Sequence, residues 1–474
     1  MSRQAKAEHG APPAESRIDW RVWRLAGVIV FGAFASGLDS SLANIGLDTI
    51  RDELRSSLGL IQWVTNGYLL ALAMSLPVCA WLGRKVGVGR LWLAALVAFT
   101  IASGLCAAAP DAGLLIGLRV VQGLAAGLLI PAGQTILGQA VGPDRLGQVI
   151  ATLGIVVTLA PALGPVIGGL ILHSLSWRWL FLVNLPIGAI GLALGLRLIP
   201  RGERGAAPPL DWRGLVLVGA GLPLVVLALT EWGATGSVLS AVVLIPLAVG
   251  IVALVAFGLH SRRRTDSLLD LGLYRNPVYT AAIGTAGFTG AVMFGGALLY
   301  PLYFQILHHD DVVGTGLRML ALGGGTALAL PFAGWLTDRF GGGIVSVWGN
   351  VFGVAATVPF VFLGADANSV LVQTLLVLLG MSLALAAVPP GIAAYKTVRR
   401  EQLPDATTQV NIMQRVGGAL GGALFAVVLA GGLSHGTEAA FHTTFWWLAG
   451  CSIAALACAL WLRGALRSTR NRTT

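Results

Sequence analysis

The stretch LDSSLANIGLDTI, Leu38 to Ile50, places a carboxylate, Asp39, inside an otherwise apolar helix predicted over Trp23 to Thr49. Such a helix is long enough to cross a bilayer, which takes about 20 apolar residues. An aspartate at the centre of a membrane helix costs about 2.5–3.5 kcal/mol, so such acids usually face a bundle interior or a wet cavity and mark an ion or substrate path. Of the 21 Asp and Glu residues, Asp39 is the one expected in mid-membrane. The alternative is a structural acid held by a neighbouring hydroxyl or amide.

The composition is that of a polytopic membrane protein. Of 474 residues, 56% are hydrophobic and 11% are charged, whereas about a quarter of the residues of soluble proteins are charged. The net charge of +10 raises the question of a nucleic-acid partner, but the basic residues lie almost entirely between the apolar segments. If both chain ends face the cytoplasm, the outer segments keep only Arg51, Arg55, Arg178 and Arg318, which fits the positive-inside rule. The charge therefore indicates topology, and no nucleic-acid partner is expected.

Fourteen apolar segments are predicted to span the membrane, in the order six, two, six. They lie at about 23–49, 59–82, 91–109, 113–141, 148–172, 179–198, 214–232, 238–260, 277–306, 314–336, 344–364, 369–395, 408–433 and 442–462. Polar breaks at 200–213 and 261–276 separate the groups. We therefore expect an all-α fold with an N-terminal six-helix bundle in residues 1–198, two extra helices in 199–264, and a C-terminal six-helix bundle in 265–474.

Two Gly-rich basic turns occupy the same place in each half, Trp81 to Arg90 and Gly334 to Gly343. Internal symmetry of this kind is typical of alternating-access transporters. Six residues of these turns are predicted to form the cytoplasmic gating loops: Arg84, Lys85, Gly87, Arg90, Asp338 and Arg339.

Metal, disulfide and nucleotide chemistry find no support in the residues. The four cysteines, Cys79, Cys106, Cys451 and Cys458, lie inside apolar segments without metal-ligand spacing, so we expect no metal site. The chain contains no GxxxxGK[ST], HExxH or GxSxG pattern, which argues against direct ATP use and against an enzyme. The HHDD stretch from His308 to Asp311 is interpreted as a solvated outer loop in preference to a pH or metal feature.

The fourth predicted span, with LRVVQG at Leu118 to Gly123, carries a second intramembrane charge, Arg119. At about 1.5 Å of rise per residue, Asp39 and Arg119 both fall in the outer half of the membrane and could share one cavity. Gln122, one turn along the same face, can hydrogen-bond either group. We therefore predict that Asp39 and Arg119 form a proton-coupling site. The alternative for Arg119 is a side chain that snorkels outward.

Other polar residues are candidates for lining a central cavity. They come from the first two spans, from span four and from span thirteen, and they are Asn44, Gln62, Asn66, Tyr68, Gln122, Asn411, Gln414 and Arg415. Trp63 and Phe294 are aromatic candidates for an apolar wall, although aromatic residues in spans more often anchor a helix at the interface.

Span five contains GIVVTLAPALGPVIGGLIL, Gly154 to Leu172. Its prolines each remove a backbone donor and its glycines leave a smooth groove. These residues, Gly154, Pro161, Gly164, Pro165, Gly168 and Gly169, predict a bent, closely packed helix that acts as a hinge.

These motifs together resemble a known family. The run from Leu38 and Asp39 through Asn44 resembles the first-span motif LDxTIVNVALP, and Leu118 to Gly123 resembles the fourth-span motif with its proton-linked arginine. Ala162 to Gly169, ALGPVIGG, resembles the antiporter motif of exporters. SWRWLFLVNLPIG, Ser176 to Gly188, is similar to the sequence that distinguishes fourteen-span exporters. Over nearly its whole length, the sequence is identified as a member of the major facilitator superfamily, in the fourteen-span drug/proton antiporter family.

The resemblance implies export of a hydrophobic or cationic small molecule in exchange for protons, by alternating access across a bacterial inner membrane. It implies the proton gradient as energy source and no bound cofactor. In the family motif GxLADRxGRR, the positions of the Gly, the Asp and the first Arg are occupied here by Ala80, Arg84 and Lys85. The cytoplasmic charge latch is therefore expected to differ, whereas Asp338 and Arg339 keep the acid and base of the second half.

Three other functions stay open alongside drug export: a dedicated exporter of one endogenous metabolite or lipid, an importer, and a transport-dead receptor or scaffold. The Pro and Gly pattern of span five disfavours the importer, and the retained charges Asp39 and Arg119 disfavour the scaffold. Two modes of assembly also stay open, a chain that works alone as a monomer in the lipid bilayer and one that docks a periplasmic adaptor.

Overall fold

The computed structural model describes residues 19–141, 145–202, 209–237, 239–262, 264, 268–364 and 367–473, and these residues form helices and short connections without a strand. Thirteen helices in this part are long and apolar enough to cross a membrane. A further helix, α6 (Leu146–Ser174), has 29 residues and occupies the place of the fifth predicted span. The order of the helices therefore follows the fourteen predicted spans, and the all-α polytopic fold is confirmed.

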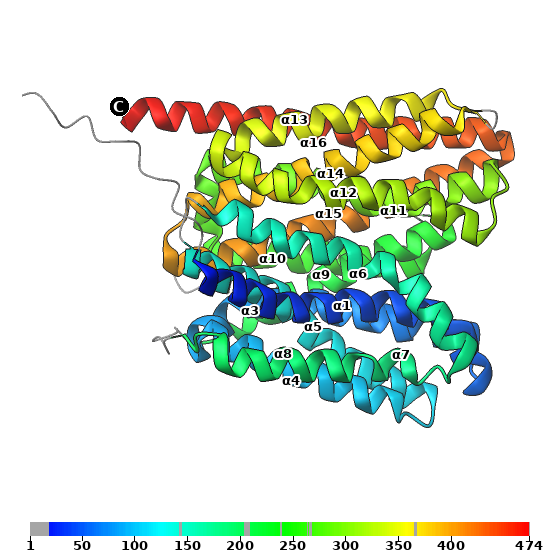
Figure 1. Ribbon diagram of the computed structural model, residues 1–474, viewed down its shortest axis with the longest axis horizontal. Helices are drawn as coiled ribbons and strands as arrows, with labels where there is room; N and C mark the ends of the chain where they lie inside the picture. Colours follow the sequence, from blue (N-terminus) through cyan, green and yellow to red (C-terminus); the bar gives the residue numbers. More distant parts are fainter. Residues whose placement is uncertain are drawn as a thin grey trace, which may run out of the picture.

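The N-terminal half packs around two clusters of buried apolar side chains. Its helices are α1 (Trp20–Glu53), the short α2 (Leu58–Ile61), α3 (Trp63–Val86), α4 (Val88–Ala107), α5 (Ala112–Val141), α6, the short α7 (Trp179–Leu182) and α8 (Asn184–Leu198). The helices run side by side along one direction (Figure 1). α1 extends to Glu53, beyond the predicted end at Thr49, because charged residues that lower the hydropathy of a window still fit the last turn of a helix.

The C-terminal half repeats the arrangement. It contains η2 (Leu271–Arg275), α11 (Pro277–Leu302), η3 (Tyr303–Leu307), α12 (Val312–Phe340), α13 (Gly342–Thr357), η4 (Val358–Val361), α14 (Ser369–Lys396), η5 (Arg400–Gln402), α15 (Leu403–Gly432), η6 (Leu433–His435) and α16 (Thr437–Thr473). The described chain begins with α1 and ends with α16 on the same side of the molecule (Figure 1), as an even number of spans requires.

Short polar side chains cap several of these helices. Asp311 accepts a hydrogen bond from the backbone N–H of Gly314 at the start of α12, and Asn368 accepts one from Val370 at the start of α14. Such a cap satisfies a backbone donor that has no partner within the helix. Asn276 does the same at the start of α11, where Pro277 follows at a position that needs no donor.

Two seams join the halves. At one seam α6 packs against α1 of its own half and against α12 of the other. At the other seam α3 and α5 approach α15. The extra helices α9 (Trp212–Thr235) and α10 (Ala241–Arg262) pack on each other, and α9 contacts both α3 and α15. The two inserted helices therefore lie along this second seam. The division of the chain at residues 198 and 264 stays a prediction.

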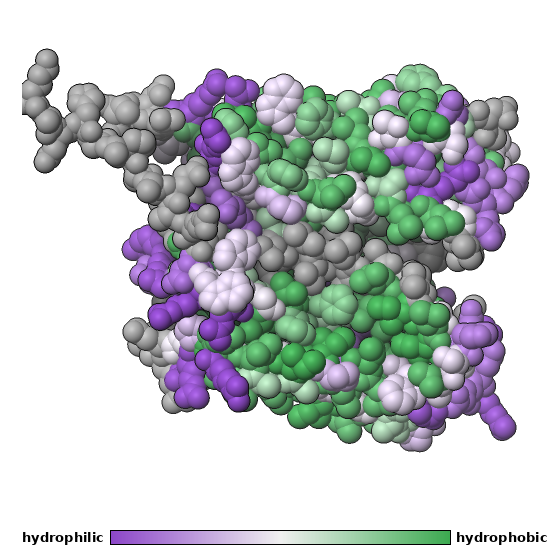
Figure 2. Space-filling model, in the orientation of Figure 1, coloured by the Kyte–Doolittle hydropathy of each residue, from purple (hydrophilic) through white to green (hydrophobic). Residues whose placement is uncertain are grey.

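The two ends of the molecule differ in how closely the halves approach. Figure 2 shows an apolar band between polar ends, and its outline is hollowed between the two halves at the end where α1 finishes. At the opposite end, where α3 and α12 finish with Arg84 and Arg339, polar contacts tie the halves together. Because that end carries the arginines assigned to the cytoplasm, the chain adopts an arrangement closed at the predicted cytoplasmic end.

Candidate functional site

The predicted pair is present: the Arg119 Nη1 of α5 lies 2.5 Å from the Asp39 Oδ2 of α1. Both side chains are fully buried. The two charges therefore offset each other in a region without solvent, where an ion pair is little screened. Asp39 is held by two amides as well as by the arginine.

Two amide side chains complete the site. Gln122 accepts a hydrogen bond from Arg119 at 2.7 Å and donates one to Asp39 at 3.0 Å. Asn184 of α8 donates to the same carboxylate oxygen, Asp39 Oδ1, at 2.7 Å. Its amide nitrogen also lies 3.0 Å from the hydroxyl of Ser103 on α4, which in turn donates to the Phe181 carbonyl. The network thus joins four helices, α1, α4, α5 and α8.

Asn184 and Ser103 were missed by the sequence analysis. Asn184 stands inside the SWRWLFLVNLPIG motif, and a buried amide in an apolar span was the available signal. Ser103 carries no such signal, because a serine within a membrane helix can satisfy its hydroxyl on its own helix.

Close helix packing places Arg119. A Cβ at Gly123 would meet the Tyr68 carbonyl, so only glycine lets α5 approach α3 at this height. As a result the Arg119 Nε donates to the Val64 carbonyl of α3 at 3.0 Å. Its guanidinium also lies 4.1 Å above the Tyr68 ring, a cation–π arrangement. Arg119 does not snorkel outward.

The Asp39 carboxylate accepts hydrogen bonds from Arg119, Gln122 and Asn184 at once. Among the described residues, Arg119 Nη2 and Asn184 Oδ1 are buried without a hydrogen-bond partner. Protonation of Asp39 would leave the guanidinium without its counter-charge, and an uncompensated buried charge is strongly unfavourable.

Of the cavity candidates in the N-terminal half, Gln62 and Asn44 are exposed near the outer end, and Asn66 is partly exposed. Asn44 accepts a hydrogen bond from Thr65 at 2.8 Å, which joins α1 to α3. Tyr68 is fully buried beside Arg119, with its hydroxyl 3.2 Å from that of Ser36. Tyr68 and Gln122 therefore belong to the buried network in this arrangement and do not line an open cavity.

The candidates on α15 face the seam. Asn411 donates to Gln134 of α5 at 2.7 Å, across the two halves. One turn on, Arg415 is partly buried. Gln414 is also partly buried and lies against α11, where its backbone meets Gly290.

The predicted hinge helix α6 lies between the halves. On one face, Gly164 abuts Ser41 and Gly168 lies against Leu42 and Ile45 of α1. On another, Gly154 meets Leu330 of α12. Gly169 faces open space. The side chains of Pro161 and Pro165 lie outside the described residues.

The gating loops hold the predicted cytoplasmic end together. Arg84, in the last turn of α3, forms an ion pair with Asp405 in the first turn of α15. At the symmetry-related place, Asp338 of α12 accepts from the backbone N–H groups of Gly147 and Gln148 at the start of α6, each at 3.0 Å. The latch expected to differ is thus present in the first half with its charges reversed. Asp405 was missed by the sequence analysis.

The remaining loop residues shape the turns. Gly87 has a φ of 91°, a left-handed conformation that favours glycine. Arg90 donates to the Val86 and Gly202 carbonyls. Lys85 lies over the Trp81 ring and Arg339 over the Trp335 ring. The ion-pair partner of Asp338 is Lys396 of α14, at 3.7 Å.

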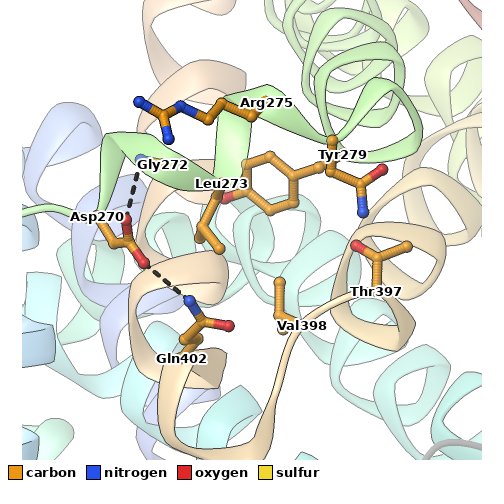
Figure 3. A pocket seen from close by; sticks show the side chains of 9 residues that line it. Asp270, Gly272, Leu273, Arg275, Tyr279, Thr397, Val398 and Gln402 are labelled. Atoms are coloured by element: carbon orange, nitrogen blue, oxygen red, sulfur yellow. Dashed lines mark hydrogen bonds between the residues drawn. The ribbon is translucent and has the colours of Figure 1, made fainter.

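A polar pocket of about 300 Å³ opens at the same end, between η2 and the connection from α14 to α15 (Figure 3). In it Asp270 accepts hydrogen bonds from Gly272 N–H and from Gln402, both at 2.9 Å. Tyr279 lines the pocket and donates to Gln409 of α15. These contacts anchor the start of the C-terminal half to α15.

Comparison with known proteins defines the class. The profile of the Major Facilitator Superfamily matches residues 29–422. Among solved structures, the proton:xylose symporter XylE superposes with a TM-score of 0.66, covering 92% of this chain and 94% of that one at 12% identity. The chain is a membrane transporter of the Major Facilitator Superfamily and not an enzyme.

Its relatives carry transporter and resistance names. A multidrug resistance protein B homolog of Mycobacterium tuberculosis is 34% identical over 422 residues, 88% of this chain and 78% of the relative. The tetracenomycin C resistance and export protein of Streptomyces glaucescens is 29% identical over 86% of this chain and 76% of the relative. The riboflavin transporter RibZ of Clostridioides difficile is 29% identical over 89% of this chain and 91% of the relative.

Proposed function

We propose that this transporter exports hydrophobic, drug-like compounds across a bacterial plasma membrane in exchange for protons. The observation that carries the proposal is the buried network of Asp39, Arg119, Gln122 and Asn184, which joins α1, α5 and α8 of one half around one carboxylate. The names of the Mycobacterium and Streptomyces relatives support the substrate class.

In the proposed cycle, Asp39 binds a proton and Arg119 loses its counter-charge. The loss favours a different packing of α1 against α5 and α8, because the guanidinium must find another partner or water. α6 transmits the change to the other half, since its glycines pack on α1 and on α12. Opening the predicted cytoplasmic end requires breaking the Arg84–Asp405 pair and the Asp338 contacts.

A second candidate is a dedicated transporter of one metabolite. The match with the riboflavin transporter covers 91% of that relative, and it favours the second candidate.

Uptake into inverted membrane vesicles tests both. With an imposed proton gradient, radiolabelled tetracenomycin C and radiolabelled riboflavin would be supplied separately to vesicles holding the wild type or Asp39→Asn. Gradient-driven uptake of tetracenomycin C in the wild type alone would support proton-coupled drug export. Uptake of riboflavin alone would favour the dedicated transporter. Equal gradient-driven uptake in both variants would place the coupling elsewhere.

A further inference from the structure

Arg415 presents a charge that no described group offsets. Its guanidinium has no hydrogen bond, ion pair or ring contact with any part of the chain that the structure describes. Asp39 is already offset by Arg119. The other acids of the described spans lie near helix ends. Those at one end of the molecule are Asp338, Glu401 and Asp405, and those towards the other end are Asp48, Asp52, Glu53, Glu231 and Glu438.

Arg415 lies on the face of α15 that is turned towards the other half of the molecule. Residues 411, 415 and 422 share one helix face, because a helix has 3.6 residues per turn. Asn411 on this face reaches α5 in the other half, and Arg415 lies in the neighbourhood of the uncharged Tyr68 of α3. A Cβ at Gly422 would meet nothing within 4 Å, so the face becomes open beyond Arg415.

The flanking faces of α15 are occupied. Ile412 and Val416 pack in the cluster with α9, and Gly417 packs against Gly287 of α11. The guanidinium therefore points between the halves and away from lipid. An aromatic ring lies close by, since Phe294 of α11 packs over Gly418 and keeps 43% of its surface exposed.

We propose that Arg415 is the recognition residue of the central substrate site and that it selects aromatic compounds carrying one negative charge, a carboxylate or a phenolate. This inference rests on the proposed export function and narrows the hydrophobic or cationic class that the family resemblance implies. A guanidinium binds a carboxylate through two parallel hydrogen bonds, and the exposed ring of Phe294 can pack on the aromatic body. A cation placed beside Arg415 is repelled, because no acid is at hand to offset both.

Three probes of one shape separate the charge classes: 2-naphthoate, the neutral 2-naphthamide and 2-naphthylmethylammonium. Binding of each radiolabelled probe to the purified full-length chain in lipid nanodiscs is measured at neutral pH without a proton gradient. We expect 2-naphthoate to bind at least about tenfold more tightly than the ammonium probe, a difference of about 1.4 kcal/mol.

Substitutions at Arg415 provide the second part of the experiment. Arg415→Gln should weaken 2-naphthoate binding about tenfold and leave 2-naphthamide within about twofold, since only the charged contact is lost. Arg415→Lys should bind 2-naphthoate with an affinity between those of the wild type and Arg415→Gln. Lysine keeps the positive charge but cannot form the two parallel hydrogen bonds of a guanidinium. The matched control is Arg213→Gln, which removes the same charge from an exposed position in the first turn of α9.

Equal binding of the charged probes, preference for the ammonium probe, no binding of any probe, or 2-naphthoate binding unchanged in Arg415→Gln would each overturn the inference. Failure of the proposed function is distinguishable, because it would appear as Arg415-dependent binding without gradient-driven uptake.

Discussion

The Arg84 guanidinium and the Asp405 carboxylate form an ion pair across the seam between α3 and α15, at the end of the molecule where the halves meet. The symmetry-related contact uses the opposite polarity, because Asp338 of α12 binds backbone N–H groups at the start of α6. In the first half the carboxylate belongs instead to Asp405 of α15, and Arg84 at the end of α3 supplies the positive charge. The arginine in place of the family's acid therefore preserves the latch with its charges exchanged.

Reversing the charge of one residue in the Arg84–Asp405 ion pair should open the predicted cytoplasmic end. Arg84→Asp places two carboxylates together, and we expect the closed population to fall about fivefold, or about 1 kcal/mol for a pair that is partly exposed on the arginine side. Turnover should change more than substrate range. The combined change Arg84→Asp with Asp405→Arg should restore the closed population. Spin-label distances between Lys85→Cys and Arg399→Cys measure it, and a double variant as open as the single ones would contradict a direct interaction.

The Asp39–Arg119 pair should show strong energetic coupling. Asp39→Asn leaves a buried guanidinium uncompensated, so we expect a folded protein whose free energy of unfolding falls by about 3–5 kcal/mol and whose proton-driven transport is lost. Adding Arg119→Gln removes the orphaned charge and should recover much of the stability without recovering transport. Denaturant titration of the four variants gives the coupling energy, and simple additivity of the two single effects would refute the pairing.

Two glycines of the span-five motif differ in their surroundings and form a matched test. A Cβ at Gly164 would collide with Ser41 of α1, whereas a Cβ at Gly169 meets nothing within 4 Å. Gly164→Ala should therefore cost about 1–3 kcal/mol of stability through overpacking and slow transport. Gly169→Ala should be neutral or slightly stabilising, because alanine favours a helix over glycine. Thermal unfolding and transport rates measure both, and similar behaviour of the two variants would argue against close packing of α6 on α1.

Acid should weaken the anchor of the inserted helices. Burial raises the pKa of Asp211, but the Gly214 N–H, His260 and Arg264 together hold it below its ordinary value of 3.8. Because the folded-state pKa lies below that of the unfolded chain, the carboxylate adds stability above about pH 4 that is lost as the pH falls through the lower value. Melting temperatures of the detergent-solubilised wild type should drop below pH 4. In Asp211→Asn this part of the drop should be absent, and identical pH profiles would contradict the assignment.

Several site residues were within reach of the sequence, and others were not. Asp39 and Arg119 could be paired because each is a charge in an apolar span, and their depths along the helices were comparable. Asn184 lay in a recognised motif, but its contact with Asp39 joins residues 145 positions apart. Tyr68 was expected in the cavity and lies in the buried network, because side-chain direction depends on which neighbouring helix each face meets.

What the sequence by itself determined is the set of spans and the two charges at the centre of the N-terminal half. The lipid bilayer makes these features predictable, because every backbone polar group in it must find a hydrogen-bond partner within its own helix. Charged side chains are therefore confined to the helix ends or to functional sites. Only the tertiary structure decided that Arg84 pairs with Asp405, that α9 lies along the seam of α3 and α15, and that Arg415 faces the other half without a described partner. These relations depend on the register in which helices distant in sequence pack. The hydropathy of a single segment does not predict that register.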